Sequence, residues 1–296
     1  MAIRYSQTKG ERLATIALYV TMVVILFITM YPFLYVVSMS ISDPVAVISR
    51  KVWLWPVGFS TEAYELVFQN DGVWRAYYNT FWYTIVGTLV NVTLTVMAAW
   101  PLSRRTFIGR KPIMGMIVIT MFFSGGLIPT FILINQLGLY NTRWVMIFPS
   151  AVSAFLIIIA RTFFQSIPDA YIEAAKLDGA NDIGILWKIV LPLSRPILAV
   201  LALFYAVGHW NAFFTPLVYL PSPDLQPMSL FLTRVLIQDD QTIAGSGGVV
   251  DTYARSMLAI QLPYALIVVV TVPIVLVYPF LQKHFAKGVM LGGLKD

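Results

Sequence analysis

A charged stretch between residues 166 and 192 carries the side chains best suited to a specific bond with another molecule. Small and apolar residues recur there around one carboxylate at i, i+3, i+4 and i+7, so they share one narrow face of a predicted helix. Such a face lets another protein approach closely, and its carboxylate can form strong planar bonds with an arginine of that partner. The same pattern can equally belong to a hairpin that stabilises the chain's own bundle. The residues are Ala170, Glu173, Ala174 and Leu177.

The first of two short helices in this stretch is predicted from its end signals. Ser166 can cap it and Pro168 suits its opening turn. Asp169 then lies where the helix dipole favours a carboxylate. Gly179 permits the left-handed conformation with which helices often end.

The second short helix follows Gly179. Asn181 or Asp182 can cap its N-terminus. The helix is predicted to run to Pro192, so residues 166–192 form a helical hairpin.

Other kinds of chemistry are missing from the chain. No Gly-Lys dipeptide occurs, so the phosphate-binding G-x-x-x-x-G-K-[ST] loop is absent. There is no cysteine, and the two histidines, His209 and His284, stand in no recognisable metal-ligand spacing. We therefore predict no catalytic residues, no metal site and no enzymatic activity in this chain.

The composition indicates a membrane protein. The 296 residues are 58% hydrophobic and 11% charged with a mean hydropathy of +0.77, whereas soluble domains carry about 25% charge. Six stretches free of Asp, Glu, Lys and Arg are each long enough to approach or exceed a bilayer span, and such runs favour helices over barrel strands. We predict an all-α membrane protein with six transmembrane helices. The stretches are 13–42, 76–103, 112–142, 144–160, 196–223 and 256–282.

The charge distribution predicts the orientation. A net charge of +6 in a soluble protein would point to nucleic acid, but here 14 of the 20 basic residues fall on one side of the six predicted spans. The other side keeps eight of the 14 carboxylates. The positive-inside rule therefore places both termini in the cytoplasm and leaves no reason to expect a nucleic-acid partner. The 14 are Arg4, Lys9, Arg12, Arg104, Arg105, Arg110, Lys111, Arg161, Lys176, Lys188, Arg195, Lys283, Lys287 and Lys295.

Two groups of residues inside the spans are candidates for a solute pathway. Gly125, Gly126 and Pro129 are predicted to kink or break the third span, and such breaks are tolerated where they line a watery cavity or pack in protein. In the fifth span, a polar run at 209–211 can line a pore or form hydrogen bonds between helices. That run is His209, Trp210 and Asn211, and Asn79, Asn91 and Gln136 carry the same two alternatives.

The stretch 166–192 also resembles a known family. Glu173-Ala174-Ala175, then three residues, Gly179, then nine residues and Ile189-x-Leu191-Pro192 match the EAA loop of permeases of binding-protein-dependent ABC importers. The resemblance covers nearly the whole chain and is greatest to carbohydrate permeases of the maltose type. Further matches are Trp210-Asn211-x-Phe213, and Phe285-x-Lys287-Gly288 followed by Gly292-Gly293-x-Lys295. The segments 123–130 and 137–142 are similar to those of LplC-like and alginate-type oligosaccharide permeases.

The resemblance implies a type I ABC importer permease fold, as a single transmembrane domain over 1–296 in a bacterial plasma membrane. It implies a second permease, two ATPase subunits that bind ATP and Mg, an extracytoplasmic solute-binding protein, surrounding lipid and a carbohydrate substrate. Residues from about 166 to 192 would couple to the ATPase, with Glu173 as the salt-bridge residue and Gly179 at the turn. The tail from about 283 to 296 would contact the ATPase through Lys287, Gly288, Gly292 and Lys295.

The residues alone leave one other function open. An ion-coupled secondary transporter of a small polar solute commonly holds charged relays within its spans. The six predicted spans hold no Asp, Glu, Lys or Arg, although a site built from carbonyls is possible.

Overall fold

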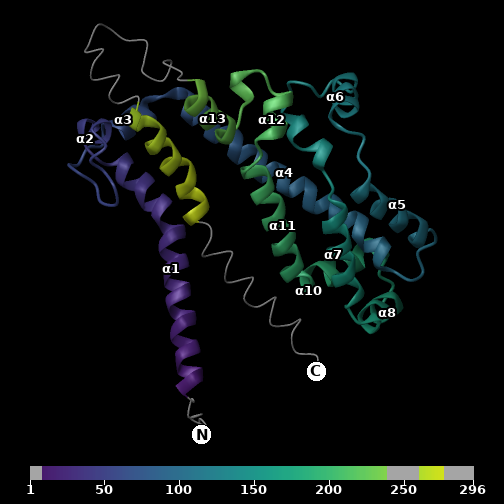
Figure 1. Cartoon of the computed structure of the whole chain (residues 1–296). Helices are drawn as coiled ribbons and strands as arrows, with labels where there is room; N and C mark the ends of the chain where they lie inside the picture. Colours follow the sequence, from purple (N-terminus) through teal and green to yellow (C-terminus); the bar gives the residue numbers. More distant parts are fainter. Residues whose placement is uncertain (1–8, 239–259, 277–296) are drawn as a thin grey trace. The chain divides into compact units, whose positions relative to one another are not determined.

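A computed structural model describes residues 9–238 and 260–276, and every regular element in these ranges is helical (Figure 1). The chain divides into two compact units. Of the described residues, unit 1 comprises 9–70, 234–238 and 260–272, and unit 2 comprises 71–233 and 273–276. Each unit is described below by itself.

Unit 1 is built around the long apolar helix α1 (Lys9–Ser40). Nearly all of its large apolar side chains are exposed, and only Ser38, Met39 and Ser40 are buried. An apolar surface on all sides is typical of a helix that faces lipid. The other elements of the unit are α2 (Pro44–Ile48), α3 (Glu62–Gln69) and the helix Ile260–Leu276 as far as residue 272.

Gln261 fixes the helix Ile260–Leu276 to the end of α1. Its fully buried amide nitrogen shares its two hydrogens among the carbonyls of Met39, Ser40 and Ser42, at 3.3, 3.0 and 2.7 Å. Because a buried amide is costly to leave unpaired, these bonds specify how the two helices meet.

Unit 2 is organised around α4 (Asp71–Ser103), which packs on α7 (Ala154–Gln165) and α11 (Arg195–Trp210). Ala99 and Ala160 are fully buried in the resulting core, where small side chains let helices approach closely. The remaining elements are α5 (Arg110–Phe122), α6 (Leu127–Gln136), η1 (Arg143–Met146), η2 (Phe148–Ser150), α8 (Asp169–Leu177), α9 (Asp182–Ile185), the π-helical η3 (Leu186–Val190), α10 (Leu191–Leu193), α12 (Phe214–Tyr219), η4 (Pro223–Leu225) and α13 (Met228–Gln238).

Two of the described helices, α1 and α4, are long and apolar enough to cross a membrane. Three bent helix pairs bring the number to five if each pair counts as one span. The bends are 117° between α5 and α6, 56° before α7, and 84° before α11. The described part of the sixth stretch, Ile260–Leu276, is a shorter apolar helix, so the six-span count stays a prediction.

Charge-free stretches proved a poor guide to where helices end. The stretch 196–223 was predicted as one helix, but α11 ends at Trp210 and α12 starts only at Phe214. Arg161, predicted to follow the fourth span, lies inside α7. A long basic side chain tolerates such a position near a helix end, because it can extend toward the polar interface.

The break in the third stretch is confirmed, but its cause differs from the prediction. The chain leaves α5 at Phe123 and enters α6 after Gly126, whose φ of +82° is a conformation that favours glycine. Pro129 lies in the first turn of α6. A missing N–H is tolerated in a first turn, so Pro129 does not break a helix here.

Candidate functional site

The helix α8 buries one face and exposes the face on which Glu173 lies. Ile172 and Ala175 are buried in the same core cluster as Trp100 and Phe164. The hairpin thus packs on the chain's own bundle through this buried face, as the alternative from the sequence allows, but all residues of the opposite face are exposed. They are Ala170, Glu173, Ala174 and Leu177, the last 90% exposed.

The start of α8 differs from the prediction. Ser166 ends α7 instead of capping α8, and its hydroxyl donates to the Phe163 carbonyl at 2.7 Å. Pro168 occupies the N-cap position in an extended conformation, so no side chain caps α8. Ile167, in the connection between α7 and α8, is buried in the same core cluster. Asp169 does lie in the first turn, as predicted.

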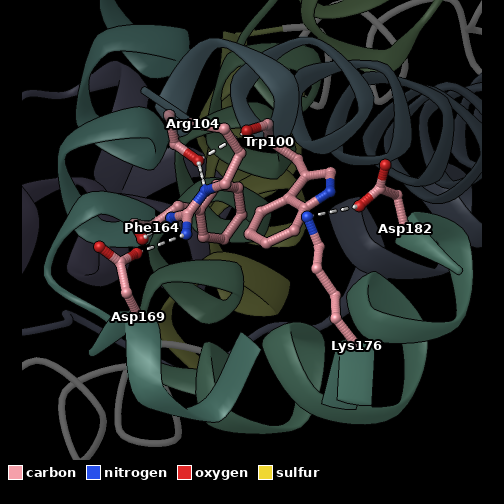
Figure 2. Close-up of polar contacts among 7 residues, drawn as sticks. Trp100, Arg104, Phe164, Asp169, Lys176 and Asp182 are labelled. Atoms are coloured by element: carbon pink, nitrogen blue, oxygen red, sulfur yellow. Dashed lines mark hydrogen bonds and ion pairs between the residues drawn. The ribbon is translucent and has the colours of Figure 1, made fainter. Parts of the chain in front are cut away.

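The turn after α8 matches the prediction. Gly179 has a φ of +80°, and the Asn181 side chain accepts a hydrogen bond from the Gly184 amide at 2.7 Å, which caps α9. An ion pair of 3.8 Å between Lys176 and Asp182 crosses the turn (Figure 2). The predicted helical hairpin is therefore present.

The second arm of the hairpin is not a regular α-helix. Its middle is the π-helical turn Leu186–Val190, and the arm continues through α10 to Leu193 rather than ending at Pro192. Ile189 and Leu191 are half-buried against the core, whereas Pro192 is exposed. Single π turns within α-helices are frequent at functional sites.

Arg104 binds three helices together at the base of α8 (Figure 2). Its guanidinium donates to the Phe164 carbonyl at the end of α7 at 2.5 Å and to the Asp169 carboxylate of α8 at 3.4 Å. It also lies over the Trp100 ring of α4, 4.5 Å from the centroid, and donates to the Ser103 hydroxyl at 2.9 Å. Burial lowers the pKa of this guanidinium, and the nearby Asp169 carboxylate opposes that shift.

The apolar and polar contacts of α8 have one mechanical consequence. A force applied to its exposed face reaches α4 and α7 through packed side chains and through Arg104, because packed cores transmit strain rather than absorb it. Figure 1 shows α8 beside the end of α7, at the same end of unit 2 as α10.

Sequence reasoning missed Arg104 and the exposed apolar residues beside Glu173. Arg104 follows Trp100 by four residues, the spacing at which a cation can cover a ring on the same helical face, and that signal was available. Further apolar side chains exposed on the two arms of the hairpin are Tyr171, Ile183 and Trp187.

The two groups of predicted pathway residues lie on different elements. Gly125, Gly126 and Pro129 are exposed at the junction of α5 and α6. His209 is buried near the end of α11 and lies against Gly87 of α4. Whether either group lines a pathway stays a prediction.

The polar run at the end of α11 contributes to packing in part. The Asn211 side chain donates to the Val207 carbonyl of its own helix at 2.9 Å, so the predicted interhelical bond through Asn211 is wrong. The Trp210 ring meets the Phe81 ring of α4 edge to face, with centroids 5.3 Å apart. In the described part of the chain, the buried Nε2 of His209 has no hydrogen-bond partner either, so this run contacts α4 through aromatic packing and through the His209 ring against Gly87.

Two of the other polar candidates form hydrogen bonds between elements. Asn79 donates to the carbonyls of Asp224 and Gln226, at 2.8 and 3.1 Å, and Asn91 donates to the Ser150 carbonyl at 3.1 Å. Gln136, by contrast, is exposed. The predicted tail contacts lie outside the described residues: Lys287, Gly288, Gly292 and Lys295.

One protein family matches most of the chain, including the hairpin. The family described as "Binding-protein-dependent transport system inner membrane component" matches residues 72–291. The chain belongs to this family. It is thus an inner-membrane transport permease rather than an enzyme.

Similar proteins extend the match over almost the full permease. The polygalacturonan/rhamnogalacturonan transport system permease protein YtcP of Bacillus subtilis (strain 168) is 41% identical, over 96% of this chain and 99% of that protein. Protein LplC of the same organism is 40% identical over 90% of each chain. A crystal structure of a bacterial ABC transporter that imports the acidic polysaccharide alginate contains a similar chain. It superimposes with a TM-score of 0.87 at 32% identity, over 95% of this chain and 99% of the other.

Proposed function

We propose that this permease forms one half of the translocation pathway of an ATP-binding-cassette importer. The whole chain, 1–296, acts as one multi-pass transmembrane domain with six spans and both termini in the cytoplasm of a bacterium. A second permease, two ATPase subunits and an extracytoplasmic binding protein complete the complex. ATP and Mg bind to the ATPase subunits.

The exposed face of α8, anchored to α4 and α7, carries this proposal. Glu173 projects from a surface of small side chains, where an arginine of the ATPase can pair with it. Closure of the two ATPase subunits then moves α8, and the Arg104 contacts transmit that movement to α4 and α7. Alternating access follows if ATP favours the outward-facing state, because only differential affinity for two states can shift their populations.

We further propose that the solute is an oligosaccharide that carries uronic acids. Two of the similar proteins are named for polygalacturonan/rhamnogalacturonan and for alginate. Arg143 adds a residue-level reason: its guanidinium lies over the rings of Tyr78 and Trp82, 5.1 and 5.4 Å from their centroids, and donates to the Asn79 amide oxygen at 3.1 Å. These partners are neutral, so the positive charge is left for a carboxylate of the solute.

Charge reversal at Glu173 tests the coupling assignment. In Glu173→Lys we expect the ATPase to dissociate from the membrane complex or its hydrolysis to become independent of solute, since like charges would meet at the interface. Uptake of radiolabelled oligogalacturonate and the amount of co-purified ATPase are the two measurements. We expect uptake to fall by tenfold or more, because a buried, hydrogen-bonded charge pair contributes roughly 2–5 kcal/mol when one partner is removed.

The control is Glu62→Lys, the same change at an exposed position of α3 in unit 1. It should leave the co-purified ATPase at the wild-type level. Wild-type uptake and wild-type ATPase recovery in Glu173→Lys would overturn the assignment.

A further inference from the structure

A basic cavity lies where the α4–α5 connection meets α7, beside the Arg104 contacts but separate from the exposed face of α8. Its volume is about 630 Å³. The cationic part of its lining consists of Arg105, Arg110, Lys111 and Arg161. No carboxylate lines it among the described residues.

The geometry holds two of these cations together without neutralising them. Arg161 donates through Nε to the Leu102 carbonyl at 3.0 Å, which fixes its guanidinium at the cavity wall. With its amide oxygen turned toward these two arginines, Gln165 accepts from Arg110 at 2.8 Å and from Arg161 at 3.1 Å. An amide is neutral, so the positive charges stay uncompensated.

The carboxylate in the first turn of α8 is already engaged. Asp169 pairs with Arg104, which is not part of the cavity lining. Like charges held this close raise the free energy of the structure, and a bound anion would remove that cost.

The apolar part of the lining distinguishes a lipid from a small soluble anion. Phe107 and Met114 contribute to the cavity wall next to the cations. Ile108, at the tip of the same connection, is 95% exposed. A fully exposed isoleucine between basic side chains is typical of a segment that lies in the membrane interface, where apolar groups enter the acyl region and cations meet the headgroups.

We infer that this cavity binds the phosphate headgroup of an anionic phospholipid, with its acyl chains along Phe107 and Met114. The phosphodiester oxygens accept hydrogen bonds from the guanidinium groups of Arg110 and Arg161, which suit phosphate geometry. Lys111 and Arg105 add charge. The bound lipid fixes the α4–α5 connection immediately after Arg104.

The inference uses the membrane location of the family and does not depend on the ATPase partner or on the solute. The test uses the full chain with whatever subunits co-purify, stripped of lipid in a neutral detergent. Mixed micelles that contain phosphatidylglycerol, mixed micelles that contain phosphatidylcholine, and inorganic phosphate are added in turn. Bound lipid is counted by native mass spectrometry.

Arg110→Gln/Arg161→Gln is the main variant. Each basic residue near an anionic surface adds attraction equivalent to about fivefold in affinity, so the double variant should bind phosphatidylglycerol roughly 25-fold more weakly. Arg105→Gln/Lys111→Gln is the second variant, because it leaves the bond of Arg161 to Leu102 intact. It should also bind phosphatidylglycerol more weakly than wild type, and this result can be interpreted even if the first variant folds poorly.

Arg195→Gln is the matched control, an exposed basic residue at the start of α11 that does not line the cavity. It should bind phosphatidylglycerol as wild type does. Preference for phosphatidylglycerol that is lost in both double variants and kept in the control supports the inference. Equal binding of the two lipids, unchanged binding in both double variants, or saturation by inorganic phosphate in place of lipid would overturn it.

Discussion

Arg104 connects three helices that lie far apart in the sequence. Its partners belong to the last turn of α4, the end of α7 and the first turn of α8. A planar guanidinium with five donors can serve a carbonyl, a carboxylate and a hydroxyl at once, and still cover an aromatic ring. Lysine has the same charge but lacks the planar fork.

Substitution of Arg104 should separate ATP hydrolysis from transport. In Arg104→Gln the Asp169 carboxylate and the Phe164 carbonyl lose their common donor, so movement of α8 is passed less fully to α4. We expect the amount of solute transported per ATP hydrolysed to fall about tenfold, with roughly 1–3 kcal/mol lost from stability. Parallel measurement of uptake and phosphate release in proteoliposomes gives the ratio.

Arg104→Lys serves as the comparison in that experiment. It should transport more solute per ATP hydrolysed than Arg104→Gln, because it keeps the charge next to Asp169. A purely structural role would lower stability and both activities together. An unchanged ratio in Arg104→Gln would show that α8 acts on α4 without this residue.

Arg143 should influence which solute is transported. Replacing it with Gln removes the positive charge held over Tyr78 and Trp82 but keeps a hydrogen-bond donor near Asn79. A hydrogen bond to a charged group contributes roughly 1.5–3 kcal/mol, so uptake of oligogalacturonate should fall by about tenfold. Competition by the methyl-esterified, neutral oligomer is the informative measurement.

In Arg143→Gln the neutral oligomer should compete as well as it does in wild type. Arg75→Gln is the matched control, because Arg75 is already paired with Asp224 and has less charge to offer. Equal losses for the acidic and neutral oligomers would argue against a role in charge recognition.

At the level of single residues, the sequence predicted what depends on local geometry. The positive φ at Gly179 and the cap at Asn181 follow from neighbouring residues, and both are present. The exposure of Glu173 follows from helical spacing once Ile172 and Ala175 are assigned to the core. For Arg104 the spacing from Trp100 was a local signal, but its bonds to Phe164 and Asp169, which lie 60 and 65 positions away, could not be read from neighbouring residues.

At the level of elements, the crossing of α4 and α11 depends on one glycine. A Cβ atom at Gly87 would lie 2.7 Å from Cε1 and 2.8 Å from Cδ2 of His209. The His209 ring is buried, so it has little space into which to move. Close helix approach over a glycine is a common way to pack helices in membranes.

A larger residue at position 87 should therefore destabilise the unit. Gly87→Leu inserts a branched side chain at a site occupied by His209, and overpacking of this kind costs typically 1–3 kcal/mol. A lower midpoint of thermal unfolding in detergent is the expected result. Gly115→Leu on α5 is the control, since no heavy atom lies within 4 Å of an added Cβ there.

The double variant Gly87→Leu/His209→Ala identifies what causes the loss of stability in Gly87→Leu. If the clash with the ring is responsible, removal of the ring should restore part of the lost stability. Strictly additive losses would mean that Gly87 is needed for another reason.

Helix continuity was the part of the fold that sequence reasoning handled least well. Absence of charge shows that a segment can lie in lipid, but it carries no information on whether the helix is continuous. The break at Gly126 left a glycine signal, whereas the break after Trp210 falls at Asn211–Phe213, which contains neither glycine nor proline. Pro129 misled the prediction because proline tolerates a first helical turn.

At the level of the whole molecule, the source of energy separates the two transport classes. The chain lacks a phosphate-binding loop, and the described residues of α1 and α4 place charges near their ends rather than in their middles. We expect uptake in cells to stop when ATP is depleted and to continue when proton and sodium gradients are collapsed. Uptake that follows the gradients would favour an ion-coupled transporter and contradict the importer proposal.

The π turn at Leu186–Val190 adds one residue to a helical turn that would otherwise hold fewer. One residue corresponds to about 100° of rotation around a helix axis. The direction in which Ile183 and Trp187 project is therefore rotated about the helix axis relative to the side chains of α10, which follows the π turn. Deletion of a single residue here would restore regular winding and turn this outward-facing surface by more than a quarter of a revolution, with no change in its composition.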